Sequence, residues 1–103
     1  MTDFEMIYRK KFETYMRTST SDNDIDVFTR EEQIERYGKA LSFWSIEKSN
    51  IENKKNKKII DVHKINYLWN CLKSTMDRID YMFDEKTKDL IYKRRDTILD
   101  HTT

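Results

Sequence analysis

The side chains best suited to chemistry in this 103-residue chain are one cysteine and two histidines. Cys71 and His63 lie eight residues apart in a segment whose pattern predicts a single helix, so about 12 Å of helix rise separates them. A thiol and its base must lie within hydrogen-bonding distance, so this pair cannot act as a catalytic dyad on one helix. With His101 in the tail and no second cysteine, the ligands are too few for structural zinc. We therefore predict no metal site and no cofactor.

Two groups of aspartates offer oxygen ligands or general acids. In the segment from Asp22 to Asp26, alternate residues have the spacing of the first ligands in an EF-hand calcium loop. That loop needs glycine at its sixth position and glutamate at its twelfth, where this chain has Val27 and Gln33. Calcium binding is therefore not expected, and the segment is predicted to be an acidic loop.

The second group, Asp77, Asp80 and Asp84, shares one face of a predicted helix. Paired carboxylates do acid–base work only where a cleft raises the pKa of one of them. Lys73 and Lys88 lie within one turn of the two ends, so surface ion pairing is the favoured interpretation. The chain also lacks a glycine-rich phosphate loop and the G-x-S-x-G and H-E-x-x-H motifs. We predict that the protein is not an enzyme and has no small-molecule substrate.

Basic residues gather in clusters that could contact phosphates. Such clusters favour nucleic-acid binding, whereas a net charge of only +1 gives no overall attraction to nucleic acid. Nucleic-acid binding remains an alternative, and its candidate residues are Lys54, Lys55, Lys57, Lys58, Lys93, Arg94 and Arg95.

Aromatic side chains away from the predicted core indicate a functional surface more specifically than the basic clusters do. Aromatic residues and arginine concentrate in the centres of protein interfaces. Tyr67, Cys71 and Arg78 form a second stripe on the helix that carries the longest apolar pattern. The candidate partner-binding residues are Phe43, Tyr67, Cys71, Arg78, Tyr81 and Tyr92. The alternative interpretation is that most of these side chains belong to the core.

Composition and periodicity predict that helices position all of these residues. The chain has no proline and one glycine, Gly38, whereas ordinary proteins contain roughly 5% and 7% of these residues, largely in turns. Apolar residues also recur at steps of three and four, which is one face of a helix. The predicted core seam consists of Ile34, Leu41, Trp44, Val62, Ile65, Trp69, Leu72, Met76, Ile79 and Phe83.

Local signals place the ends of the helices. Capping boxes at Thr2 and Thr29 open the first two, and Asp84 is expected to cap the fourth. The predicted helices cover about 3–17, 29–52, 58–83 and 85–99, with the acidic loop at 18–28, in a single domain of residues 1–103. The heptad register passes unbroken from the second helix into the third, as in one continuous helix. Three lysines in this register, at 48, 55 and 58, favour a hairpin turn instead.

An all-α fold follows, either a three- to four-helix bundle or a long helical hairpin. Because only 37% of residues are hydrophobic and 38% are charged, we expect a homodimer or a protein partner to complete the core. No run of about 18 apolar residues could span a membrane, and the N-terminus does not resemble a signal peptide. With one cysteine, the prediction is a cytoplasmic protein without membrane contact.

Residues 65–95, a long amphipathic helix followed by FDEKTKDLIYKRR, are similar to the helical region that precedes the helix-turn-helix of small phage late-transcription activators. The similarity covers about a third of the chain, and the DNA-reading module of that family would follow Arg95, where this chain has DTILDHTT. Enrichment in Lys, Asn, Ile and Asp indicates an AT-rich genome, which fits a phage or mobile element acting in the host cytoplasm.

The predicted function is that of a protein-interaction module, a phage-type modulator or inhibitor that occludes the surface of a host protein complex. Two alternatives remain. One is a nucleic-acid-associated factor in transcription or replication. The other is a structural coiled-coil assembly factor, which would be favoured if the second and third helices are continuous.

Overall fold

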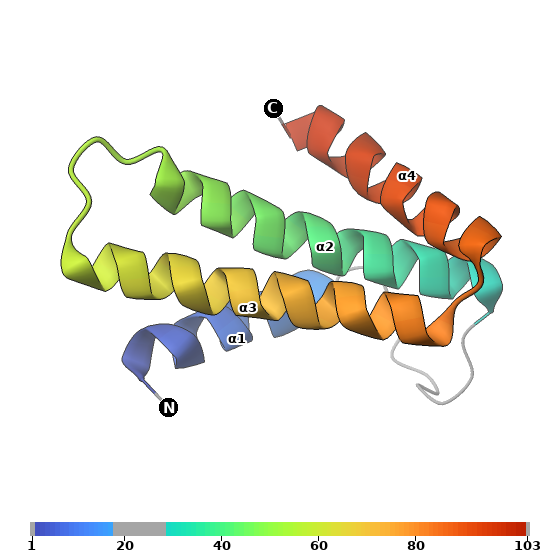
Figure 1. The fold of residues 1–103 in the computed structure, drawn as a ribbon, viewed down its shortest axis with the longest axis horizontal. Coiled ribbons are helices and arrows are strands. Elements are labelled where there is room, and N and C mark those ends of the chain that lie inside the picture. Colours follow the sequence, from blue (N-terminus) through green and yellow to red (C-terminus); the bar gives the residue numbers. More distant parts are fainter. Residues whose placement is uncertain (1, 18–28, 103) are drawn as a thin grey trace.

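The computed structural model describes residues 2–17 and 29–102, so the loop expected at 18–28 lies outside the described residues. This part of the chain contains four helices and no strand: α1 (Asp3–Arg17), α2 (Arg30–Glu52), α3 (Ile59–Met82) and α4 (Glu85–Thr102). The predicted all-α bundle is confirmed. α2 and α3 form an antiparallel hairpin, α4 runs in the same direction as α2, and α1 packs against α2 and α3 (Figure 1). No helix in the described ranges is long and apolar enough to span a bilayer.

Short polar contacts determine where the helices begin. The Thr29 hydroxyl accepts the Glu32 N–H at 3.1 Å, and the Glu32 carboxylate accepts the Thr29 N–H at 3.1 Å. At the start of α4 the Asp84 carboxylate accepts the Thr87 N–H at 3.0 Å. At α1 the Glu5 carboxylate accepts both the N–H and the hydroxyl of Thr2, at 3.0 and 2.7 Å. The first N–H groups of a helix have no partner within the helix, and these contacts satisfy some of them or orient the side chains beside them.

A turn over residues 53–58 separates α2 from α3, so the alternative of one continuous helix is wrong. Asp61, which sequence analysis did not single out, holds this turn. Its carboxylate accepts the Lys58 N–H at 3.0 Å and contacts the Lys54 ammonium through both oxygens at 3.1 Å. Asp61 is only 2% exposed. The loop lysines therefore do not simply repel one another, because one of them neutralises a buried acid.

α2 is the central helix of the bundle. Residues 40–44 are all buried, and five successive residues project all around a helix axis. α1 covers one side, where Phe12 packs against Phe43 and Trp44 with ring centroids 5.5 and 4.8 Å apart. On another side, Leu41 is fully buried in a core cluster with Ile79 of α3 and Ile91 of α4.

Gly38 lies where α4 crosses α2. A Cβ at this position would lie 2.8 Å from Cγ and 3.0 Å from Cβ of Arg94, and 3.4 Å from the backbone nitrogen of Arg95. One turn further along, the Ser42 hydroxyl donates to the Gly38 carbonyl at 2.8 Å and also contacts the Arg95 carbonyl at 3.4 Å. The Glu35 carboxylate accepts two hydrogen bonds from Arg94 at 2.6 and 3.1 Å. The one glycine of the chain thus permits close packing of two helices.

The core seam of α3 differs from the predicted one in the first half of the helix. Leu68 is fully buried, whereas Val62 and Trp69 are 49% and 45% exposed, so the placement of these two residues in the core is wrong. A strict seven-residue repeat drifts by about 20° per heptad on a straight helix, and α1 and α2 together cover the side that carries Leu68. The other seam residues are buried or half-buried: Ile34, Leu41, Trp44, Ile65, Leu72, Met76, Ile79 and Phe83.

We expect Gly38→Ala to destabilise the protein. Alanine gains about 1 kcal/mol in helix propensity, but its methyl group overlaps the stem of Arg94, and overpacking of this kind costs typically about 1–3 kcal/mol. Urea unfolding followed by circular dichroism measures the net change. Ser49→Ala, at an exposed position of α2, is the control and should stabilise slightly. An equal gain in both variants would contradict the close approach of α4 to α2.

Two capping carboxylates predict how stability depends on pH. The hydrogen bond from the Lys58 N–H has the largest effect on the pKa of Asp61 and lowers it from its ordinary value. The hydrogen bond from the Lys54 ammonium lowers it further. Hydrogen bonds from Thr87 likewise lower the pKa of Asp84. A carboxyl group whose pKa is lower in the folded state contributes stability that is complete above its unfolded pKa, about 3.9, and disappears as the pH falls through the folded value.

We therefore expect the melting temperature to fall as the pH drops below about 4. Asp61→Asn should melt earlier than the parent at neutral pH and should lose less stability on acidification, because its amide does not titrate in this range. Asp77→Asn, at an exposed position of α3, should follow the parent curve. Differential scanning fluorimetry between pH 2 and 7 compares the three proteins. An acid response of Asp61→Asn as steep as that of the parent would refute this role.

Candidate functional site

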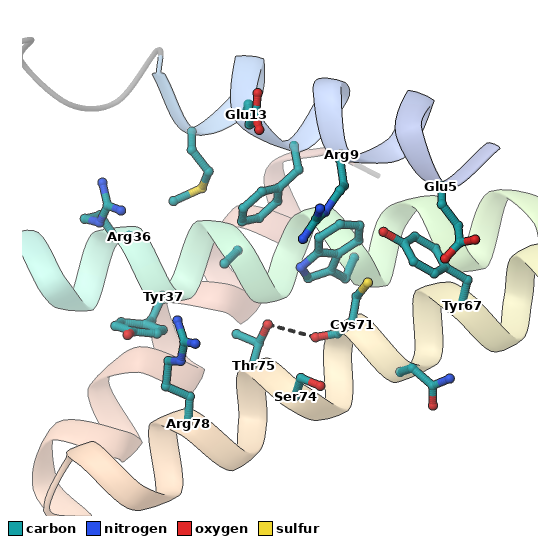
Figure 2. Close-up of a pocket in the computed structure, with 15 residues that line it drawn as sticks. Glu5, Arg9, Glu13, Arg36, Tyr37, Tyr67, Cys71, Ser74, Thr75 and Arg78 are labelled. Atoms are coloured by element: carbon teal, nitrogen blue, oxygen red, sulfur yellow. Dashed lines mark hydrogen bonds between the residues drawn. The ribbon is translucent and has the colours of Figure 1, made fainter. Parts of the chain in front are cut away.

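A groove of about 790 Å³ lies between α1 and α3, with α2 as its floor (Figure 2). Its floor consists of Ala40 and Trp44, and half-buried Phe12, Tyr67 and Cys71 add apolar surface on its walls. We call this feature the α1–α3 groove. Its volume falls within the range of natural ligand pockets, about 300–1,000 Å³.

Aromatic contacts hold α1 in place beside the groove. Tyr67 of α3 packs against Phe4 and Tyr8 of α1, with ring centroids 6.0 and 6.5 Å apart. Further along α1, the Lys39 ammonium donates to the Tyr15 carbonyl at 3.2 Å and so satisfies one of the last carbonyls of the helix. With 15 residues, α1 is shorter than α2 and α3, which have 23 and 24, so it covers only part of their length.

One arginine lies on each of two walls of the groove, at different points along its length. Figure 2 shows the Arg9 side chain reaching into it from α1 and the Arg78 side chain from α3. Both residues are exposed, and neither forms an ion pair with any residue in the described ranges. This distinguishes them from Arg94, which is paired with Glu35 across the α2–α4 interface.

Acidic residues also line the groove, but one of them is already engaged. The Glu5 carboxylate accepts two hydrogen bonds from Thr2, and these lower its pKa. Glu13 is exposed on α1. The 3.6-residue period of a helix places Glu5, Arg9 and Glu13 on one stripe of α1, so their charges alternate along this wall.

The thiol and the phenol on the α3 wall are not activated nucleophiles. Burial raises the pKa of the Cys71 thiol, which keeps it protonated at neutral pH. Burial, and then the neighbouring Cys71, raises the pKa of Tyr67 to about 12. The Thr75 hydroxyl donates to the Cys71 carbonyl at 2.9 Å (Figure 2). This wall can therefore bind and orient a ligand, and it offers apolar contact rather than covalent chemistry.

Three of the six predicted partner-binding residues meet at this groove, namely Tyr67, Cys71 and Arg78. Phe43 does not, because it is 6% exposed and packs in the core beneath α1. Its prediction as a partner contact is wrong, since α1 covers the side of α2 on which it lies.

The remaining two predicted residues lie elsewhere. Tyr81 is 92% exposed near the end of α3. Tyr92 on α4 is half-buried against the core cluster, and the Arg95 guanidinium lies 5.0 Å from its ring centroid. The structure therefore does not combine Tyr81 and Tyr92 with the groove.

The basic clusters are less available than the sequence suggests. Lys54 is paired with Asp61, Arg94 with Glu35, and Arg95 with Asp96. The cluster residues that are exposed and have no ion pair within the described part of the chain are Lys55, Lys57, Lys58 and Lys93. Three of them lie in the turn between α2 and α3. In the described ranges, no three His, Cys, Asp or Glu side chains gather to hold a metal ion.

Two lining residues, Arg9 and Trp44, were not predicted to belong to a site. Arg9 was not singled out from the sequence, and Trp44 was placed in the core seam. One signal was present, because Glu5, Arg9, Phe12 and Met16 recur at helical spacing. This stripe of α1 combines charge with apolar surface, and it is the stripe that lines the groove.

Comparison with known proteins adds no relative. No family model matches the chain, and neither the curated proteins nor the solved structures give a match. The site must therefore be interpreted from its own residues.

We expect Cys71 to react slowly with Ellman's reagent. Burial raises the pKa of its thiol, and the thiolate is the reactive form. At pH 7 the folded protein should be labelled at least about ten-fold more slowly than the same chain in urea. Since the chain has one cysteine, Cys71→Ser gives the background. Equal rates in the folded and unfolded states would show that the thiol is freely accessible.

Proposed function

We propose that this protein is a non-enzymatic helical interaction module that binds another protein and occludes part of its surface. The observation that carries this proposal is the α1–α3 groove, in which apolar and aromatic surface lies beside Arg9 and Arg78, two arginines that form no ion pair with residues of the described ranges. Protein interfaces are enriched in aromatic residues and arginine.

Exposed apolar side chains outside the groove also favour association. Ile59, Ile60 and Val62, which lie within one turn at the start of α3, are 79%, 45% and 49% exposed. A large apolar side chain at a soluble surface is often part of a contact when several lie close together. These residues could contribute to a homodimer or to a partner contact that extends beyond the groove.

A module of this kind suits a modulator or inhibitor of a host protein complex, encoded by a phage or mobile element and acting in the host cytoplasm. Occlusion requires a rigid surface and no reaction. The four packed helices, with α2 at their centre, provide such a surface.

Nucleic-acid binding is the second candidate, supported by the exposed Lys55, Lys57 and Lys58 in one turn. Pairing of Lys54, Arg94 and Arg95 within the protein weighs against it. A coiled-coil assembly factor is not proposed, because a continuous helix would have favoured it and α2 and α3 are separate helices.

Affinity capture from a nuclease-treated extract of the cells that make this protein tests the proposal. We expect the tagged protein to retain the same partner at about 0.1 M and about 0.5 M salt, because the apolar contact remains when salt screens the accompanying charges, whereas binding through phosphate contacts weakens steeply. The triple variant Lys55→Glu, Lys57→Glu, Lys58→Glu should retain the partner as well. Lys54 is left unchanged because it stabilises Asp61.

Capture that is lost on nuclease treatment, at high salt or in the triple variant would instead favour the nucleic-acid candidate. The matched control replaces exposed lysines outside these clusters, Lys73→Glu and Lys86→Glu. Light scattering with a mixed-sequence DNA duplex completes the comparison. A mass increase that disappears by roughly 0.3 M salt would show DNA binding directly.

A further inference from the structure

The α1–α3 groove has the length of about three helix turns. Its lining residues on α3 run from Tyr67 to Arg78, a distance of about 16 Å at 1.5 Å per residue. A helix of this length with a diameter of about 10 Å fills roughly 1,300 Å³, which exceeds the groove volume of about 790 Å³. A helix bound here would therefore place one face in the groove and keep the other face in water.

The groove surface requires that the inner face of this helix be apolar. Phe12, Tyr67 and Cys71 are half-buried around a floor of Ala40 and Trp44, so each has surface left to cover. A helix with apolar residues at spacings of three and four presents a stripe of matching shape.

The charged residues of the groove lining indicate the charge that flanks the stripe: three arginines, Arg9, Arg36 and Arg78, stand against two glutamates, Glu5 and Glu13. Arg9 and Arg78 form no ion pair in the described part of the chain. The Glu5 carboxylate accepts its hydrogen bonds from Thr2, and the nearby charge of Arg9 adds a smaller lowering of its pKa. Arg36 interacts within the protein. An uncharged occupant would cover the guanidinium groups of Arg9 and Arg78 without pairing them, which is unfavourable. A carboxylate would accept hydrogen bonds from either group.

We infer that the α1–α3 groove binds an acidic amphipathic helix of the partner protein, with its apolar stripe on Phe12 and Tyr67 and its carboxylates at Arg9 and Arg78. The inference rests on the proposed function and specifies the segment that the module recognises.

Two fluorescein-labelled peptides of about eleven residues test the inference. The first carries leucines at helical spacing and glutamates elsewhere, and its twin carries lysine in place of every glutamate. Fluorescence polarisation measures their binding to the whole protein. We expect the acidic peptide to bind at least about ten-fold more tightly than its twin. An equal or reversed preference, or no binding of either peptide, overturns the inference.

Charge reversal in the groove should change this preference. We expect Arg78→Glu to weaken binding of the acidic peptide by about ten-fold or more and to strengthen binding of the lysine twin, whereas Arg78→Lys should retain most of the parent affinity. Lys73→Glu makes the same change in charge sign at an exposed α3 position outside the groove lining, so it should affect neither peptide. If Arg78→Glu behaves like Lys73→Glu, the peptide is not in the groove.

A groove-filling variant separates this inference from the proposed function. Ser74 is exposed and lines the groove, so Ser74→Trp should abolish binding of the acidic peptide and capture of the partner. If the parent binds the two peptides equally and Ser74→Trp binds neither, the groove binds protein but the inferred charge is wrong. If Ser74→Trp still captures the partner, the proposed function stands and the groove is not its surface. If the parent captures no partner and binds neither peptide, both proposals are wrong.

Discussion

The burial of α2 on every side is the constraint on which the rest of this structure depends. Only 37% of the residues are hydrophobic, and the chain concentrates burial in one helix, where residues 40–44 are all buried. Each neighbouring helix must therefore fit a different side of α2. α4 approaches closely because Gly38 and Ser42 are small, whereas α1 fits through the stacking of Phe12 on Trp44.

The α1–α3 groove is a consequence of the same arrangement. The aromatic contacts of Tyr67 fix α1 beside α3 at one end, but α1 is too short to cover the whole α2–α3 hairpin. Apolar surface of the three helices therefore remains partly open between them. Arg9 and Arg78 border this surface, and the carboxylates nearest in sequence do not pair with them. A bundle that leaves the space between α1 and α3 incompletely filled thus provides a binding site without any special motif.

Features set by neighbours in sequence could be predicted, whereas those set by packing could not. The capping pairs Thr29–Glu32 and Asp84–Thr87 act within three residues, so the helix starts follow from local chemistry. The exposure of Trp69 depends on which side of α3 the other helices cover, and the periodicity alone does not determine that side. The approach of Arg9 and Arg78 to one groove is likewise a product of helix packing. Sequence analysis therefore found the α3 wall of the groove and missed the α1 wall.

The central position of α2 also affects how the chain leaves the ribosome. α2 is complete once Glu52 has been added, but two of the three helices that cover it follow in the chain, and α4 ends only at Thr102. At roughly 5–20 residues per second this interval lasts about 3–10 s, whereas a helix forms within about a microsecond. Translation therefore sets how long Leu41 and its neighbours remain uncovered on each nascent chain. During those seconds the residues that will form the centre of the core are open to other unfinished chains.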